Sequence, residues 1–197
     1  MSDTAPLLVG IGGSAGATSL TEAAMRYCLS AAVDAGARVR LFAGADLDLP
    51  LYVPGRRRDA RVGALLDAVA SCNGVVLASP AYHGTLSGRV KNALDYLEDL
   101  SAASPCYLDG RPVAVIATAA GATAAAHTIA TLRGIAHALR GWPTPLGVAI
   151  DTRTVSFLAG SVAFDDRTAR QLTLMGRQLV QCATAFASDP AELTVAR

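Results

Sequence analysis

The chain has 197 residues and a formal net charge of +1 at pH 7, so its charge does not favour nucleic acid or an anionic membrane as a partner. Hydrophobic residues make up 52% of the sequence and charged residues 17%, which is typical of a folded chain with a large core rather than of a disordered one. We expect a single domain over residues 1–197.

The N-terminus lacks the basic region and the cleavage site of a signal peptide, and we expect a cytoplasmic protein. The cysteines agree with this location, because they form no C-x-x-C motif and have no metal-ligand spacing. We therefore expect buried free thiols in a reducing compartment, and no metal site. The cysteines are Cys28, Cys72, Cys106 and Cys182.

Short apolar runs alternate with segments of helical periodicity along the whole chain. The runs predict five buried strands, at residues 7–12, 37–43, 74–79, 112–118 and 145–150. Apolar residues spaced like one face of a helix follow each strand. The first predicted helix carries Leu20, Ala23, Ala24, Tyr27, Cys28 and Ala31, and the others extend over residues 62–69, 90–97, 129–139 and 172–186.

One apolar stretch, residues 113–132, is long enough to resemble a membrane span. It contains four Thr, one His and one Gly, and its first third has the composition of a strand. We interpret it as strand, turn and helix. We also expect Thr85 or Ser87 to cap the third helix, and Asp165 or Asp166 to open the last one.

Strands and helices that alternate in this way predict a three-layer α/β sandwich, in which a five-stranded parallel sheet has helices on both faces. Right-handed crossovers bring the carboxyl ends of the strands to one edge of such a sheet, and ligands bind there. The loops after the strands are therefore the first places to look for a site.

The loop after the first strand, GIGGSAGATS at residues 10–19, partly matches the dinucleotide fingerprint G-x-G-x-x-G/A. That fingerprint also needs an acidic residue about 20 positions later, at the end of the second strand. Asp34 precedes the second strand and Asp46 lies too far along the chain, so a dinucleotide site of this type is disfavoured. A P-loop is excluded, because the only lysine is Lys91.

The remaining possibility for this loop is a single phosphate monoester. The hydroxyls of Ser14, Thr18 and Ser19, together with amides at a helix N-terminus, suit such a group without any cation. The alternative is a tight turn with ordinary Ser and Thr caps.

The segment SPAYHGTLSGRVKNALDYL, residues 79–97, resembles the NAD(P)H-dependent FMN reductase family. That family has a pattern like P-x-Y-x-G-s-x-x-G-x-x-K-x-x-x-D after its third strand, and G-S-x-R-x-x-S in its first loop. The segments DLPLY (48–52) and LDGRPVAVIAT (108–118) are also similar, so the resemblance spans residues 7–150. The matching motif residues are Pro80, Tyr82, Gly84, Gly88, Lys91 and Asp95, with Gly13, Ser14 and Ser19 in the first loop.

The resemblance implies a flavodoxin-like fold, FMN as cofactor, and NADPH or NADH as co-substrate. It also implies a homodimer or homotetramer. The flavin carries the chemistry in such enzymes, so we expect no catalytic side chain. The residues implied at the cofactor are Ser14, Thr18, Ser19 and Leu20 around the phosphate, Pro80, Ala81, Tyr82, His83 and Gly84 along the ring, and Thr118, Ala119, Ala120 and Gly121 on its other side.

The sequence departs from the family pattern at several positions. Gly16 stands where the family usually has Arg, so one phosphate contact is missing. Ala81 and His83 replace a frequent Glu and Asn. Outside these motifs, we expect residues 56–58, three arginines, to form a solvated surface run rather than a clamp for the 2′-phosphate of NADPH. Lys91 and Asp95, one helical turn apart, are expected to pair or to reach a partner subunit.

The resemblance implies that NAD(P)H delivers a hydride to N5 of FMN. Reduced flavin then either leaves to supply a partner monooxygenase, or stays bound and reduces a quinone, an azo compound or another acceptor. The missing phosphate contact favours the first outcome. An electron-carrying flavodoxin is a further alternative, but flavodoxins are usually strongly acidic, and a flavin-free protein that kept the fold is another.

Overall fold

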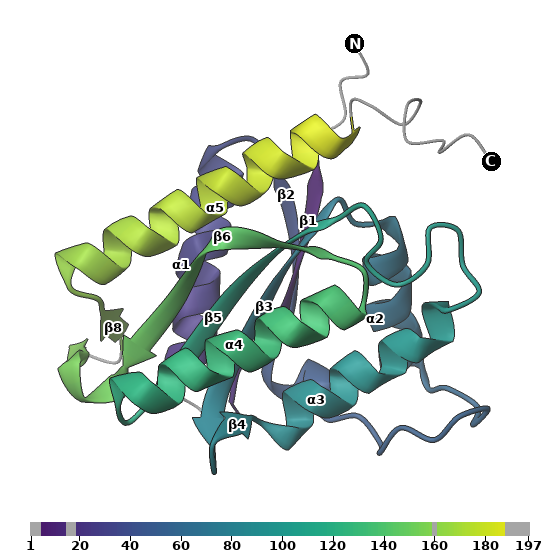
Figure 1. The fold of residues 1–197 in the computed structure, drawn as a ribbon, viewed down its shortest axis with the longest axis horizontal. Coiled ribbons are helices and arrows are strands. Elements are labelled where there is room, and N and C mark those ends of the chain that lie inside the picture. Colours follow the sequence, from purple (N-terminus) through teal and green to yellow (C-terminus); the bar gives the residue numbers. More distant parts are fainter. Residues whose placement is uncertain (1–4, 15–18, 159–160, 188–197) are drawn as a thin grey trace.

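The computed structural model describes residues 5–14, 19–158 and 161–187. Its sheet contains five parallel strands in the order β2-β1-β3-β5-β6 (Figure 1). They are β1 (Leu7–Gly12), β2 (Arg38–Phe42), β3 (Gly74–Tyr82), β5 (Pro112–Ala119) and β6 (Trp142–Asp151). This arrangement confirms the predicted parallel sheet. A sixth strand, β4 (Thr85–Leu86), is short and pairs antiparallel with β3.

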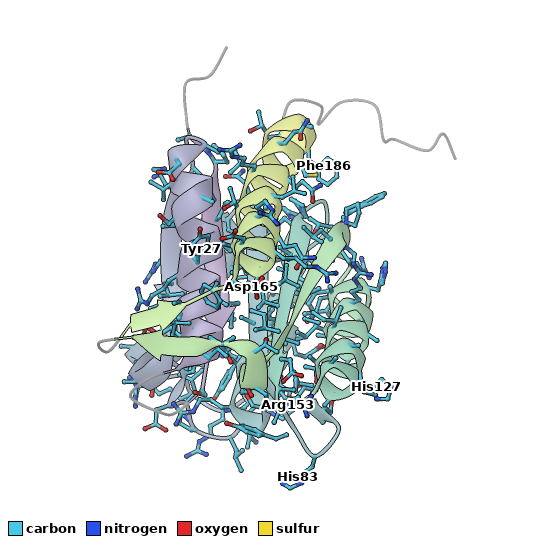
Figure 2. The ribbon with its side chains drawn as sticks, turned by 90° about the vertical axis from the view of Figure 1, so that its left-hand side faces the viewer. Tyr27, His83, His127, Arg153, Asp165 and Phe186 are labelled. Atoms are coloured by element: carbon cyan, nitrogen blue, oxygen red, sulfur yellow. The ribbon has the colours of Figure 1, made fainter. Side chains whose placement is uncertain are left out.

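Helices cover both faces of the sheet, and the strand residues alternate between two cores. Val9 and Ile11 of β1 pack with α2 (Ala60–Ser71), α3 (Gly88–Asp95) and α4 (Ala122–Ala138). Leu8, which directly precedes Val9, points the other way in the alternating pattern of a strand and packs on the opposite face with α1 (Leu20–Asp34) and α5 (Asp166–Ala187). Figure 2 shows α1 and α5 side by side on the near face.

Two strands are longer than the sequence predicted. β3 continues three residues beyond 79, because Ala81 and Tyr82 pair with β4. β6 begins at Trp142 rather than at residue 145, in spite of Pro143 and Pro145. Prolines are tolerated there because β6 is the edge strand of the sheet and needs ladder partners on one side only.

The first helix turns a slightly different face to the core than predicted. Its buried residues include Thr21, Met25 and Ala32, whereas Tyr27 is 41% exposed. Tyr27 instead meets Phe164 edge-to-face, with 5.7 Å between ring centroids. Phe164 follows the hairpin formed by β7 (Ser156–Leu158) and β8 (Ser161–Ala163), which the sequence analysis did not predict.

The short elements and caps follow the sequence closely. Ser87 caps α3, and the carboxylate of Asp165 accepts a hydrogen bond from the amide of Thr168 just as α5 begins.

Residues 113–132 divide into β5, a turn and most of α4, as predicted. No helix in the described part of the chain is long and apolar enough to cross a membrane. The remaining elements are the 3-10 helices η1 (Gly44–Leu47), η2 (Tyr96–Leu100) and η3 (Thr152–Thr154).

The four cysteines are free thiols. Cys28 and Cys72 are buried as predicted, whereas Cys106 and Cys182 are half-buried. Burial raises the pKa of the Cys28 thiol to about 12, so this thiol stays protonated and unreactive at neutral pH.

The backbones of α1 and α5 approach each other closely at Gly176. A Cβ placed there would come within 2.3 Å of the carbonyl oxygen of Cys28. We expect Gly176→Ala to lower the free energy of unfolding by about 1–3 kcal/mol, because the two helices must move apart. Gly134→Ala is the matched control: Gly134 also lies within a helix, with no atom within 4 Å of an added Cβ, so this change should be neutral or stabilising. Urea unfolding of both variants measures the difference, and equal stabilities would contradict the tight contact.

Candidate functional site

The loops that the sequence analysis singled out meet at one edge of the sheet. Gly12 of β1 pairs with Ala78 of β3, and Pro80 of β3 pairs with Thr118 of β5. The chain therefore leaves these three parallel strands side by side. Figure 2 shows His83, which follows β3, at the same end of the molecule as Arg153, which follows β6.

The first loop turns away from β1 directly against the backbone of β3. The amide of Gly13 donates a hydrogen bond to the carbonyl oxygen of Ala78 at 3.2 Å. A Cβ on Gly12 would lie 1.9 Å from the same oxygen, so no side chain fits at this position. Thr18 and Gly16, which the sequence analysis placed in this loop, lie outside the described residues.

Ser19 closes the first loop and begins α1. Its Oγ accepts hydrogen bonds from the amide of Glu22 at 3.1 Å and from the amide of Ser14 at 3.0 Å. The hydroxyl proton of Ser19 is still available as a donor, because a serine hydroxyl accepts and donates at the same time. Leu20 is buried and packs in the core between α1 and the sheet, which leaves its backbone amide as the group it can offer to a ligand.

A carboxylate lies close to this loop. A Cβ on Gly13 would be 3.8 Å from Oε2 of Glu22, and Oε1 of Glu22 forms an ion pair with Nη2 of Arg26 at 2.7 Å. Glu22 was not among the residues predicted at the site. The signal was present, because Ser19 followed three residues later by Glu matches the capping-box pattern S-x-x-E.

The second segment is a β-hairpin rather than the open loop we predicted. Tyr82 pairs with Thr85 across a two-residue turn, and both turn residues have positive φ, 50° at His83 and 91° at Gly84. Such a pair of angles is typical of the type I′ turn that joins tightly paired strands. Tyr82 is 52% exposed, and His83 and Gly84 are also exposed.

Hydrogen bonds of a buried serine hold the base of this hairpin in place. Ser79 is completely buried; its Oγ accepts the amide of Ser87 at 2.9 Å and donates to the carbonyl oxygen of Pro80 at 2.8 Å. Pro80 is buried and Ala81 half-buried, so the accessible surface of the predicted ring-binding residues in this segment belongs mainly to Tyr82, His83 and Gly84. The sequence analysis did not single out Ser79.

The third segment runs from the end of β5 into α4. Thr118 is 3% exposed, and its Oγ1 lies 2.6 Å from Oγ1 of Thr21 on α1. The Thr118 hydroxyl therefore joins β5 to α1 in the interior. Ala119 is buried and Ala120 exposed. Gly121, with φ of 138°, is the N-cap residue of α4 and provides no side-chain cap, so the first amides of this helix remain open to the edge of the sheet.

A fourth segment, at the end of β6, was not predicted. Asp151 accepts hydrogen bonds from the side chain of Arg153 at 2.6–3.2 Å and from its amide at 3.0 Å. These bonds, chiefly those from the Arg153 side chain, lower the pKa of Asp151 to about 2, and the amide of Gly121 contributes as well. The carboxylate is thus ionised at neutral pH and joins the third and fourth segments.

Two other predictions concern residues near this edge. Lys91 and Asp95 form an ion pair with each other within α3, which confirms the expected pair. The surface run at residues 56–58 is only partly solvated, since Arg58 forms an ion pair with Asp99. That pair joins the loop after η1 to η2, a contact between segments that no local pattern indicates.

Residues 6–154 match the model of the NADPH-dependent FMN reductase family. The chain belongs to this family. The match confirms the resemblance found in the sequence motifs, and with it FMN as the cofactor and oxidoreductase as the class of enzyme. Over 76 residues, 38% of this chain and 39% of the relative's length, the sequence is 40% identical to an NADPH azoreductase of Bacillus sp. strain OY1-2.

Solved structures show the same fold. FerB of Paracoccus denitrificans, described as a flavoenzyme NAD(P)H:(acceptor) oxidoreductase, is 24% identical with a TM-score of 0.73, covering 92% of this chain and 98% of that one. The NADH:FMN oxidoreductase EmoB is 20% identical with a TM-score of 0.70, covering 94% and 92%. An oxidoreductase of Corynebacterium diphtheriae is 18% identical with a TM-score of 0.70, covering 93% and 99%. These likenesses confirm the predicted flavodoxin-like sandwich.

The described residues fit FMN. The first loop brings backbone amides and the Ser19 hydroxyl together where Gly12 leaves no space for a side chain, which suits a phosphate monoester. The hairpin offers the exposed Tyr82 ring and exposed turn backbone, which suit the face and polar edge of an isoalloxazine ring.

Ser19 provides a test of the phosphate end. Ser19→Ala should weaken FMN binding about tenfold, because the charge-assisted hydrogen bond to the phosphate is lost. Riboflavin, which lacks the phosphate, should bind the variant and the wild type equally. Flavin fluorescence titrations measure both affinities.

The matched control is Asp59→Ala, since Asp59 caps α2 by accepting the amide of Val62 at 3.0 Å. Loss of either cap should lower the free energy of unfolding by about 1 kcal/mol, yet Asp59→Ala should leave FMN affinity unchanged. If Ser19→Ala weakened riboflavin as much as FMN, Ser19 would not be a phosphate ligand.

Proposed function

We propose that this protein is an NAD(P)H-dependent flavin reductase that binds FMN reversibly and releases it in the reduced form, to be used by a partner monooxygenase. The observation that carries this proposal is that the predicted phosphate loop lacks the arginine usual in the family. Gly16 stands at the position where an arginine is usual in the family, and the carboxylate of Glu22 lies beside the described part of the loop. A phosphate held mainly by amides and hydroxyls, next to a carboxylate, is expected to exchange readily.

The arginines on neighbouring elements do not replace the missing charge. Arg26 is paired with Glu22. Arg89 of α3 donates from Nη1 to the carbonyl oxygen of Gly44 at 2.8 Å, and its Nη2 lies 3.8 Å from Asp48. Each of these guanidinium groups is thus held by a partner within the fold, which supports weak rather than tight retention of the phosphate.

FMN, when bound, would supply the redox chemistry by accepting a hydride from NAD(P)H at its N5 atom and passing the electrons on. The chain's own part is positioning. Tyr82 would cover one face of the ring, the hairpin backbone would border it, and the backbone of residues 119–121 would close the opposite side. Thr118 contributes through the Thr21 contact, which holds β5 against α1.

A second candidate keeps FMN bound and reduces an azo compound, a quinone or a related acceptor. The sequence identity of 40% to an NADPH azoreductase over 76 residues favours it. A flavodoxin-type electron carrier has less support, because the net charge of +1 differs from the strongly acidic balance expected of such carriers.

We also propose that the protein is cytoplasmic and forms a homodimer or homotetramer. The four free thiols support the location. A cavity of about 370 Å³ on the face of α3 and α4, lined in part by Tyr52, Leu94 and Leu139, supports association through that face.

Reversible FMN binding predicts a specific pattern of activity. NADPH or NADH added without oxygen to FMN-loaded protein should bleach the flavin absorbance near ~450 nm. Gel filtration should remove the FMN, and the NAD(P)H oxidation rate of the stripped protein should then rise with added FMN until it saturates. If yellow FMN survives repeated dilution while azo dyes are reduced, the second candidate is correct. If neither nucleotide bleaches the flavin, the protein is not a reductase.

Tyr82 provides a test of the ring end. Tyr82→Ala should weaken FMN and riboflavin equally, each about tenfold, because a contact of aromatic ring with flavin is lost while the phosphate contacts stay. Tyr82→Phe should retain most of the affinity. Tyr27→Ala is the matched control, since Tyr27 is an exposed tyrosine on α1, away from the end of the molecule that carries His83 (Figure 2). An effect of Tyr82→Ala on FMN alone would contradict its placement at the ring.

A further inference from the structure

Arg153 is held in place and yet exposed, and neither packing of the fold nor the expected contacts of FMN account for this. It follows β6 by two residues and is held by Asp151: Nε donates to Oδ1 at 3.0 Å and Nη2 donates to Oδ2 at 2.6 Å. The backbone amide of Arg153 also donates to Oδ1 at 3.0 Å. The side chain of Arg153 is nevertheless 68% exposed, against 17% for Asp151.

Asp151 binds along one edge of the Arg153 guanidinium and leaves the other edge free. A guanidinium has five N–H donors, and an oxyanion can bind either along the Nε and Nη2 edge or across the two Nη atoms. Asp151 occupies the first edge. In the described part of the chain no acceptor bonds to the Nη1 protons, and the exposed second edge is therefore available to another oxyanion.

The free edge is adjacent to the flavin site. A Cβ placed on Gly121 would lie 3.9 Å from Nη2 of Arg153, and the backbone of Gly121 contributes to the lowered pKa of Asp151. One carboxylate thus holds the arginine against the segment that closes the ring site. Because the guanidinium is already ordered, an incoming anion loses little side-chain entropy on binding to it.

We do not expect Arg153 to bind the phosphate of FMN, because the two lie too far apart. The first loop follows β1, and β6 lies three strands away in the order β1-β3-β5-β6. With about 4.8 Å between neighbouring strands, the separation is about 14 Å. A ligand that binds Arg153 while reacting at the ring must carry its own anionic group at a distance from its reactive end, and the phosphates of a nicotinamide dinucleotide meet this requirement.

We propose that Arg153 binds a phosphate group of the nicotinamide dinucleotide as it docks on the flavin. This inference rests on the proposed function, because the dinucleotide is the reductant of that reaction. The phosphate is either the 2′-phosphate of NADPH or the diphosphate common to NADPH and NADH. Asp151 is a positioning residue that aims the free edge of Arg153 at it.

The test uses FMN-loaded protein and the variant Arg153→Gln. Calorimetric titration with NADP⁺ and with NAD⁺ measures binding without turnover, and steady-state rates with NADPH and NADH give KM and kcat. We expect binding of NADP⁺ to weaken about tenfold or more, with KM for NADPH raised to the same extent and kcat nearly unchanged. The affinity for FMN should not change. Asp151→Asn should raise KM less, because the arginine remains but is no longer fixed.

Arg56→Gln is the matched control, since Arg56 is an exposed arginine in the surface run that offered the rival 2′-phosphate clamp. An effect restricted to NADP⁺ assigns Arg153 to the 2′-phosphate, and equal effects on both nucleotides assign it to the diphosphate. The proposal is overturned if Arg153→Gln leaves both nucleotides unaffected, if it lowers only Tm or FMN affinity, or if Arg56→Gln reproduces its effect. Failure of the wild type to bleach FMN would refute the proposed function instead, and the NADP⁺ titrations would still test Arg153.

Discussion

The carbonyl oxygen of Ala78 is the atom on which the proposed flavin site depends. It accepts the amide of Gly13 at 3.2 Å and leaves no space for a side chain on Gly12. The first loop must therefore cross the end of β3 with its backbone in direct contact. This crossing sets the position of Ser14, whose amide is bonded to Ser19, and so fixes where α1 starts. The phosphate end of the site is thus aligned to the same strand that carries the ring end.

Buried hydroxyls perform the corresponding task for the other segments. Ser79 fixes both strands of the hairpin at its base, and Thr21 with Thr118 joins α1 to β5. Each hydroxyl satisfies a polar group that burial would otherwise leave without a partner. The exposed parts of the site, such as Tyr82, can then be presented to a ligand by segments that are themselves held rigidly from the interior.

The sequence predicted the fold well because apolar runs and helical spacing report burial directly. It located β1, β3 and β5, the order of the helices, and the loops that meet at the carboxyl edge. It did not predict that Tyr82 lies on a paired strand, since the turn residues His83 and Gly84 are not one of the Asn-Gly or Asp-Gly pairs that usually mark a hairpin. It placed Thr118 at the flavin, but the partner of its hydroxyl is Thr21, 97 residues away along the chain. The Asp151–Arg153 pair is local, yet its position beside Gly121 depends on the register of β5 and β6.

The hydrogen bond between Thr21 and Thr118 also has a thermodynamic consequence. It is buried and joins the helix that begins at the phosphate loop to the strand that ends at the ring. Breaking a buried hydrogen bond costs free energy, so this contact fixes the spacing between the two ends of the proposed site before a ligand binds. The protein then loses little conformational entropy in ordering these two segments around a flavin, which favours binding of the whole cofactor.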